Sequence, residues 1–224
     1  MGREREQMVG HLHDAVEHEP EEPGRRAPRS LGAAFDVVAV AASAGGIGAL
    51  GYLLEGLPAT FPASVVVVQH LDPRHRSLMA DILRRRTRLA VAQARVGDQL
   101  VPGKVFIAPP DRHLLVNADG TLSLTQSELV HFVRPSADLL FESVAASYKD
   151  RAIAVVLTGT GSDGSMGVGA IKKMGGTVIA QDKESAEFSG MPAAAINTGN
   201  VDFVLPLDEI APALVELVVE AMAE

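Results

Sequence analysis

The sequence predicts an α/β protein: a doubly wound, mainly parallel sheet with helices on both faces and an added β-hairpin. Short, continuous apolar runs alternate with helix-length segments along most of the chain, which is the pattern of a parallel sheet covered on both faces. One stretch instead alternates apolar and polar residues with period two, as hairpin strands do. With 47% hydrophobic residues among 224, the chain has enough apolar material for one sizeable core.

The strands are predicted where short β-branched runs occur, and the helices in the segments between most of them. The expected strands are 36–41, 64–69, 104–108, 153–157, 176–180 and 201–205. The expected helices lie near 46–57, 74–87, 136–149, 166–174, 191–197 and 207–222. The last helix is amphipathic, so its apolar side should pack on the sheet. The hairpin is expected in HLLVNADGTLSLT, with its turn at Asp119-Gly120.

The chain divides into residues 1–34 and 35–224. The first part has three prolines, mixed charge and few large apolar residues, so we expect a flexible tail. The second part is predicted to be a single domain.

The net charge of −8 makes the chain a poor candidate for nucleic-acid binding. It has no cysteine, which excludes thiol catalysis. It also has no apolar stretch of about 18 residues, so we expect a cytoplasmic protein without membrane insertion.

The stretch VVAVAASAGGIGALGYLLEGL (37–57) contains a literal G-x-G-x-x-G at Gly46, Gly48 and Gly51. In a dinucleotide-binding loop the first of these glycines follows the strand directly. Here the match begins several residues later, and the second strand ends in Gln69-His70, without the acidic residue that such sites use. We therefore expect these glycines inside the following helix, where they help it to pack, and no nucleotide cofactor.

Ser43 lies where the first strand gives way to the first helix. Its small neighbours permit a sharp turn, and the helix N-terminus would supply N–H groups beside its hydroxyl. His70 follows the second strand, and Asp163 lies in the glycine-rich loop after another apolar strand. Because the carboxyl ends of parallel strands share one edge, the three side chains can form a nucleophile, a base and an orienting carboxylate. The alternatives are a helix cap for Ser43, a surface residue for His70 and a loop or cap aspartate for Asp163.

Six motifs, in order, resemble the catalytic domain of the chemotaxis protein-glutamate methylesterases, the CheB family. They are ASAGG at 42–46, VVQHL at 67–71, PGKVFIAPPDRHL at 102–114, RPSADLLFESVA at 134–145, LTGTGSDGSMG at 157–167 and SGMPAAAINTGNVD at 189–202. The resemblance implies that Ser43 is the nucleophile, His70 the general base and Asp163 the carboxylate that orients it rather than a helix cap. It also implies an oxyanion hole made by the backbone N–H groups of Ala44 and Thr160.

The implied reaction is hydrolysis of glutamate methyl esters on the cytoplasmic helices of chemoreceptors, with no metal or cofactor. The family also deamidates glutamine, and the residues leave open whether this chain does. The usual arginine after GMP is replaced by Ala193. Family members commonly carry a receiver domain that residues 1–34 are too short to contain, so we expect any regulation to come from a separate partner. The alternatives are a serine esterase or amidase with another substrate, and a non-catalytic binding module.

Four further residues lie outside the candidate triad. His75, His113 and His131 are interpreted as structural or surface residues. Arg134 either meets polar groups on a receptor helix or forms an ion pair that holds the loop before a helix capped by Ser136.

Overall fold

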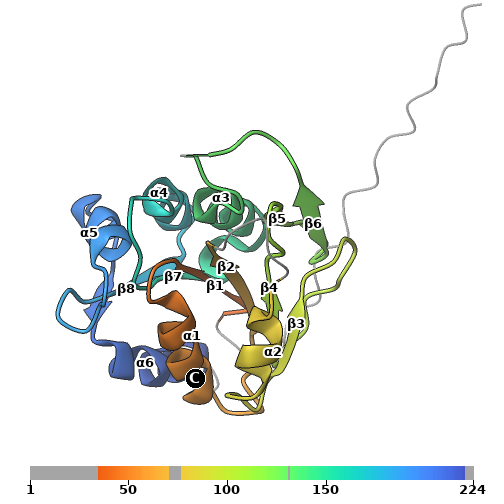
Figure 1. The fold of residues 1–224 in the computed structure, drawn as a ribbon, viewed down its shortest axis with the longest axis horizontal. Helices are drawn as coiled ribbons and strands as arrows, with labels where there is room; N and C mark the ends of the chain where they lie inside the picture. Colours follow the sequence, from red (N-terminus) through yellow and green to blue (C-terminus); the bar gives the residue numbers. More distant parts are fainter. Residues whose placement is uncertain (1–34, 71–76, 131, 220–224) are drawn as a thin grey trace, which may run out of the picture.

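A seven-stranded sheet runs through the centre of the molecule, in the order β3-β4-β2-β1-β7-β8-β9 (Figure 1). The computed structural model describes residues 35–70, 77–130 and 132–219. All neighbouring strands of this sheet are parallel, as the sequence predicts. They are β1 (Val37–Ala42), β2 (Ser64–Gln69), β3 (Ala90–Gln93), β4 (Lys104–Ile107), β7 (Ala152–Val156), β8 (Thr177–Gln181) and β9 (Phe203–Leu205).

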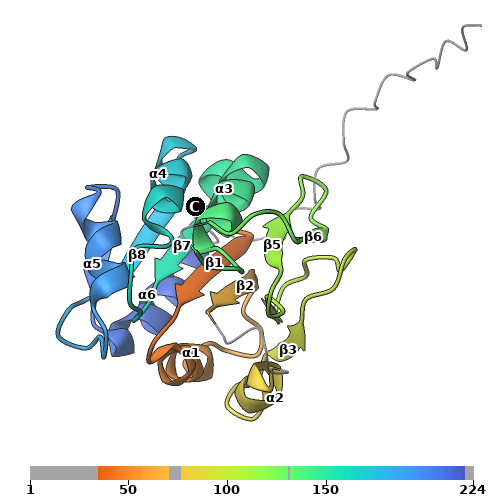
Figure 2. The same ribbon diagram turned by 45° about the horizontal axis from the view of Figure 1, so that its top comes forward.

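Helices cover both faces of the sheet, because alternate residues of each buried strand point to opposite sides. Val38, Val40 and Ala42 of β1 join one apolar cluster, whereas Val37 and Ala39 join the other. The first cluster is closed by α1 (Gly46–Glu55), α2 (Met79–Arg84) and α6 (Leu207–Val219). The second is closed by α3 (Ala137–Tyr148), α4 (Ser165–Lys173) and α5 (Gly190–Asn197). Figure 2 shows α3 and α4 on one side of the sheet and α1 and α2 on the other.

The predicted hairpin is present as a separate two-stranded sheet. Its antiparallel strands are β5 (His113–Val116) and β6 (Leu122–Thr125). Leu114, Val116 and Leu122 point into the same apolar cluster as α3, so the hairpin extends the cover of that face.

The structure contains two elements that the sequence pattern did not predict. Strand β3 has only four residues and lies at the edge of the sheet, with Val91 alone fully buried, so it lacks the long apolar run that reveals a central strand. A single 3₁₀ turn, η1 (Lys149–Arg151), links α3 to β7.

The predicted tail at 1–34 lies outside the described residues. Among the described helices, none combines the length and the apolarity needed to cross a membrane.

The chain builds the sheet outward from β1 in both directions. It first goes to β2, β3 and β4, and then returns to the other side of β1 for β7. The connections that leave the carboxyl ends of β1 and β7 therefore diverge, and α/β proteins bind their ligands in the crevice at such a switch point.

Candidate active site

The register of the sheet places Ser43 beside His70. Ala42 and Gln69 are partners across β1 and β2, and each candidate residue follows directly. The His70 N–H donates to the Ala42 carbonyl at 3.2 Å, which continues the strand pairing by one step. On the other side, the Ser43 N–H donates to the carbonyl of Thr158, after β7, at 3.0 Å. Ser43 thus lies at the switch point, with His70 on the neighbouring strand, roughly 5 Å away between strand axes.

The turn after Ser43 depends on glycine. Gly45 has a φ of +74° and is the N-cap of α1, and the Gly46 N–H donates to the Ser43 carbonyl at 2.8 Å. A left-handed residue at this point is accessible to glycine at little cost. The Ser43 hydroxyl caps no helix and has no hydrogen-bond partner among the described residues. The helix-cap alternative for Ser43 is therefore wrong, and its hydroxyl is available for chemistry.

The literal G-x-G-x-x-G match lies within α1, as predicted. A Cβ atom on Gly46 would come within 2.1 Å of the Gln69 Oε1 atom, and one on Gly51 within 2.6 Å of the Arg86 guanidinium. Gly48 faces open space. Gly46 and Gly51 therefore allow α1 to pack closely against the side chains of Gln69 and Arg86.

His70 and Asp163 form a close pair. The His70 Nε2 atom lies 2.8 Å from the Asp163 Oδ2 atom, and the two side chains are 16% and 4% exposed. Because an ionised carboxylate can only accept, the neutral imidazole must carry its proton on Nε2. The Nδ1 atom of His70 then keeps its lone pair, and it has no partner among the described residues. It is the ring nitrogen that can accept a proton from Ser43.

The Asp163 carboxylate also binds the N-terminus of α3. It accepts from the Ala137 N–H at 2.6 Å, the Asp138 N–H at 3.2 Å and the Ser136 hydroxyl at 2.8 Å. Burial raises the pKa of Asp163, but the bonds from His70 and from these groups outweigh it, so the pKa lies below the ordinary value. The expectation that Asp163 does not cap a helix is thus wrong, because the loop after β7 meets the start of α3. Asp163 also bonds His70, and its orienting role stays a prediction.

A second carboxylate binds the N-terminus of the next helix. Asp138, in the first turn of α3, accepts from the N–H groups of Met166 and Gly167 at the start of α4, at 3.0 and 2.8 Å. Its own N–H donates to Asp163. The loop with Asp163 is therefore fixed between the first turns of two helices.

The predicted oxyanion donors lie on either side of Ser43. Within the described part of the chain, the N–H groups of Ala44 and Thr160 have no hydrogen-bond acceptor. Gly159 packs so closely that a Cβ atom on it would come within 2.9 Å of the Ser43 Cβ atom, and Gly161 has a φ of +84°. Two unpaired N–H groups flanking a serine fit an oxyanion hole, which remains a prediction.

Gln69 is a site residue that the sequence analysis did not single out. It is 3% exposed, and its Nε2 atom donates to the carbonyls of Ser43 at 2.7 Å and His70 at 3.1 Å. Its Oε1 atom is buried without a hydrogen-bond partner among the described residues and lies against Gly46. The signal was available, because a polar residue that ends a run of four valines must be hydrogen-bonded inside.

His113 and Ser136 hold the start of α3. The His113 Nδ1 atom accepts from the Ser136 N–H at 3.1 Å, and its Nε2 atom donates to the Glu128 carbonyl at 3.0 Å. Ser136 is the N-cap of α3, as predicted, and His113 is buried and structural. Burial lowers the pKa of His113, and the Arg134 charge adds to this, against a smaller opposing effect of the Glu128 carbonyl. His75 and His131 lie outside the described residues.

Arg134 is paired inside the chain. Its Nη2 atom lies 2.6 Å from the Asp111 Oδ1 atom, and its Nη1 atom donates to the Ser127 carbonyl at 2.7 Å. The ion-pair alternative for Arg134 is therefore confirmed: it ties the loop before Ser136 to the segment between β4 and β5.

A serine at a strand-to-helix turn, a histidine–carboxylate pair and unpaired N–H groups, all at the switch point of a parallel sheet, are the parts that serine hydrolases combine. The family model described as CheB methylesterase matches residues 38–214. The chain belongs to the CheB methylesterase family.

Three relatives illustrate this similarity. The protein-glutamate methylesterase/protein-glutamine glutaminase of Symbiobacterium thermophilum is 40% identical over 197 residues, which cover 88% of this chain and 53% of the relative. A relative from Leptospira interrogans is 38% identical, over 82% of this chain and 95% of its own length. The crystal structure of the Thermotoga maritima CheB methylesterase catalytic domain matches with a TM-score of 0.79 and 41% identity, over 82% of this chain and 99% of that one. The chain spans about half the length of most of the curated relatives compared, from 46% to 61%.

Proposed function

We propose that residues 35–224 form a serine hydrolase that removes methyl esters from glutamate side chains of proteins. The observation that carries the proposal is the His70–Asp163 pair beside the unpartnered hydroxyl of Ser43 at the switch point. The names of the relatives, protein-glutamate methylesterase, supply the substrate. The chemoreceptors of the resembled family are the proposed targets, and any regulatory partner would be a separate protein.

Each residue of the candidate site has its own role in the proposed reaction. The His70 Nδ1 atom accepts the proton of the Ser43 hydroxyl as its oxygen attacks the ester carbonyl. The N–H groups of Ala44 and Thr160 donate to the oxyanion of the tetrahedral intermediate. The same histidine then returns its proton to the departing methanol, and a water attacks the resulting acyl-enzyme. Asp163 keeps the Nε2 proton in place throughout and stabilises the imidazolium.

The same chemistry extends to glutamine. Attack on a side-chain amide gives the same acyl-enzyme and releases ammonia instead of methanol, and the relatives are also named protein-glutamine glutaminase. A small-molecule ester as substrate, or a binding module without catalysis, are the competing proposals.

The test is methanol release from membranes that hold a methylated chemoreceptor. We expect Ser43→Ala to fold as the wild type does by circular dichroism and to release no methanol above background. A fluorophosphonate probe should label the wild type at Ser43 and leave the variant unlabelled. Ser127→Ala, which removes an exposed hydroxyl elsewhere, is the matched control and should keep the wild-type rate. Turnover by a folded Ser43→Ala protein would overturn the assignment, and wild-type labelling without methanol release would favour another ester.

A further inference from the structure

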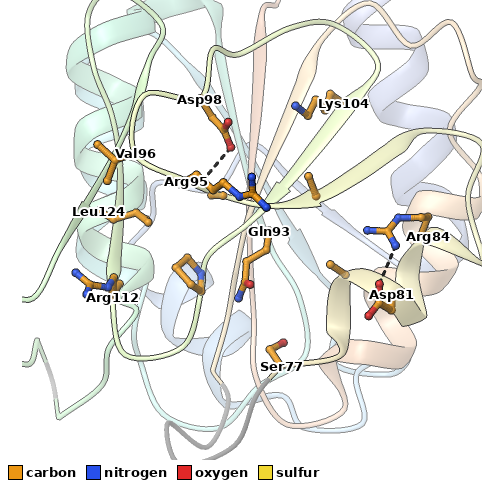
Figure 3. A pocket seen from close by; sticks show the side chains of 14 residues that line it. Ser77, Asp81, Arg84, Gln93, Arg95, Val96, Asp98, Lys104, Arg112 and Leu124 are labelled. Atoms are coloured by element: carbon orange, nitrogen blue, oxygen red, sulfur yellow. Dashed lines mark hydrogen bonds and ion pairs between the residues drawn. The ribbon is translucent and has the colours of Figure 1, made fainter.

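A hollow of about 820 Å³ lies along the edge strand β3, away from the three candidate catalytic residues. Its walls come from α2, from β3 and the loop after it, from the start of β4 and from the segment after β4 (Figure 3). Figure 3 shows Arg84 and Arg95 pointing into the hollow from opposite sides. We call this hollow the edge groove.

The edge groove is positively charged within an acidic protein. Arg84, Arg95, Lys104 and Arg112 line it, against only two carboxylates. Its lining therefore has a net charge of +2 in a chain of −8. A local concentration of one sign of charge, opposite to the sign of the whole chain, steers a partner of the other sign to one place.

Only some of these cationic side chains have partners within the protein. Arg84 bonds Asp81 and the Val91 carbonyl of the edge strand, and the Lys104 ammonium lies over the ring of Phe106. The side chains of Arg95 and Arg112 are exposed and have no ion-pair partner among the described residues. These two are the charges that the edge groove offers to a ligand.

The edge groove reaches the carboxyl edge of the sheet, where the candidate active site lies. Arg95 follows the carboxyl end of β3, and Arg112 precedes His113, whose ring holds Ser136 against Asp163. Two strand spacings separate β3 from β2, which His70 follows, and three separate it from β1, which Ser43 follows, so the β3 wall of the groove lies roughly 10 Å from His70 and roughly 14 Å from Ser43. An α-helix covers these distances in about two to three turns.

We propose that the edge groove docks the acidic face of a helical substrate, so that carboxylates about two to three turns from the scissile ester meet Arg95 and Arg112. The proposal rests on the proposed function. Each hydrolysis leaves a glutamate carboxylate on the substrate, so the substrate surface becomes more acidic as the reaction proceeds. A chain of net charge −8 would repel such a surface. Exposed charges act over only about 8 Å at physiological salt, so the cations that attract this surface must lie within about that distance of its carboxylates.

The test uses two helical peptides with one central glutamate methyl ester each. One carries glutamates two and three turns to either side of the ester, and the other carries glutamines there. We expect the wild type to hydrolyse the acidic peptide with a kcat/KM at least about fivefold higher, a preference that shrinks as salt is raised. Arg95→Gln/Arg112→Gln should abolish the preference.

The matched control is Lys149→Gln/Lys173→Gln. It removes the same charge from two exposed lysines at the C-terminal ends of α3 and α4, on the opposite edge of the sheet, and should keep the preference. The proposal is overturned if the wild type shows no preference, if the groove variant keeps it, or if both variants lose it equally. A labelled DNA duplex tests whether the groove binds polyanions in general. The proposal is also overturned if the wild type and the lysine control bind the duplex at the same salt and the groove variant does not.

Binding separates this proposal from the proposed function. The anisotropy of fluorescein-labelled peptides reports docking without turnover, and the acidic peptide should bind the wild type at least about fivefold more tightly than the neutral one. If the wild type hydrolyses neither peptide, the proposed function fails, while the anisotropy still decides whether the edge groove docks an acidic helix. Equal affinity for the two peptides overturns the docking proposal whatever the rates.

Discussion

Gln69 fixes the turn that presents Ser43, the proposed nucleophile. Gln69→Met removes both donated hydrogen bonds while keeping much of the apolar volume, so the Ser43 carbonyl keeps only the Gly46 N–H. We expect kcat to fall by one to two orders of magnitude with little change in KM, because small displacements of a reacting atom cost about 100-fold. Gln69→Glu should be worse, since a carboxylate oxygen would face the Ser43 carbonyl. A Gln69→Glu enzyme with near-wild-type rates of fluorophosphonate labelling would refute this role.

Asp163 serves two purposes, so its substitution should have two effects. Asp163→Asn should lower the rate by several orders of magnitude by favouring the wrong tautomer of His70. It should also destabilise the fold by about 1–3 kcal/mol in urea unfolding, because the new NH₂ group faces the N–H donors at the start of α3. Ser43→Ala is the control, losing the rate but not the stability. Wild-type stability for Asp163→Asn would mean that α3 does not depend on this carboxylate.

Two glycines of α1 should respond in opposite ways to the same change. Gly46→Ala places a Cβ atom 2.1 Å from the Gln69 Oε1 atom and 2.8 Å from the Ala42 Cβ atom, so it should displace Gln69 and lower both stability and rate. Gly48→Ala meets open space and should stabilise the helix by about 0.5–1 kcal/mol. Urea unfolding and methanol release check both. Stabilisation by Gly46→Ala would show that the contact with Gln69 relaxes freely.

The sequence pattern predicted the central elements well because their burial is extreme. In β2 the run of four valines is buried on both faces, and the predicted bounds are the observed ones. The edge strand β3 escaped notice, because burial on one side leaves no continuous apolar run. The hairpin was visible because its two short strands alternate around Asp119-Gly120.

The candidate site could be predicted only in part, for a physical reason. Parallel strands bring their carboxyl ends together, so Ser43 and His70 could be paired from order alone. The bonds from the start of α3 to Asp163 join two elements whose contact no local pattern encodes. The position of Gln69 at the end of four valines marked it as a buried polar residue, but the sequence could not show that its partner is the backbone carbonyl of Ser43.

The stability of the whole molecule should depend on pH through His113. Burial holds its folded pKa below the ordinary value of 6.5, whereas the unfolded chain takes up a proton near that value. Below about pH 6.5 the unfolded state therefore binds more protons, and stability falls as the pH falls, by at most about 1.4 kcal/mol per pH unit. Above that range the residue contributes no pH dependence. His113→Gln can keep both hydrogen bonds without titrating.

The measurement is the free energy of unfolding in urea at pH 7.5 and 5.5. The wild type should lose more stability between these values than His113→Gln does. Equal losses in the two proteins would mean that His113 takes up its proton in the folded state as readily as in the unfolded one.

Asp163 and Asp138 each bind the first turn of a helix, and this affects how the molecule unfolds locally. One carboxylate binds the first turn of α3, the other binds the first turn of α4, and the loop with Asp163 lies between them. Neither turn can fray without releasing the loop. The amide hydrogens of Ala137, Asp138, Met166 and Gly167 should therefore exchange with deuterium as one cooperative unit, at a rate well below that of an ordinary helix end. A ligand that slows exchange at any one of them should slow it at all four.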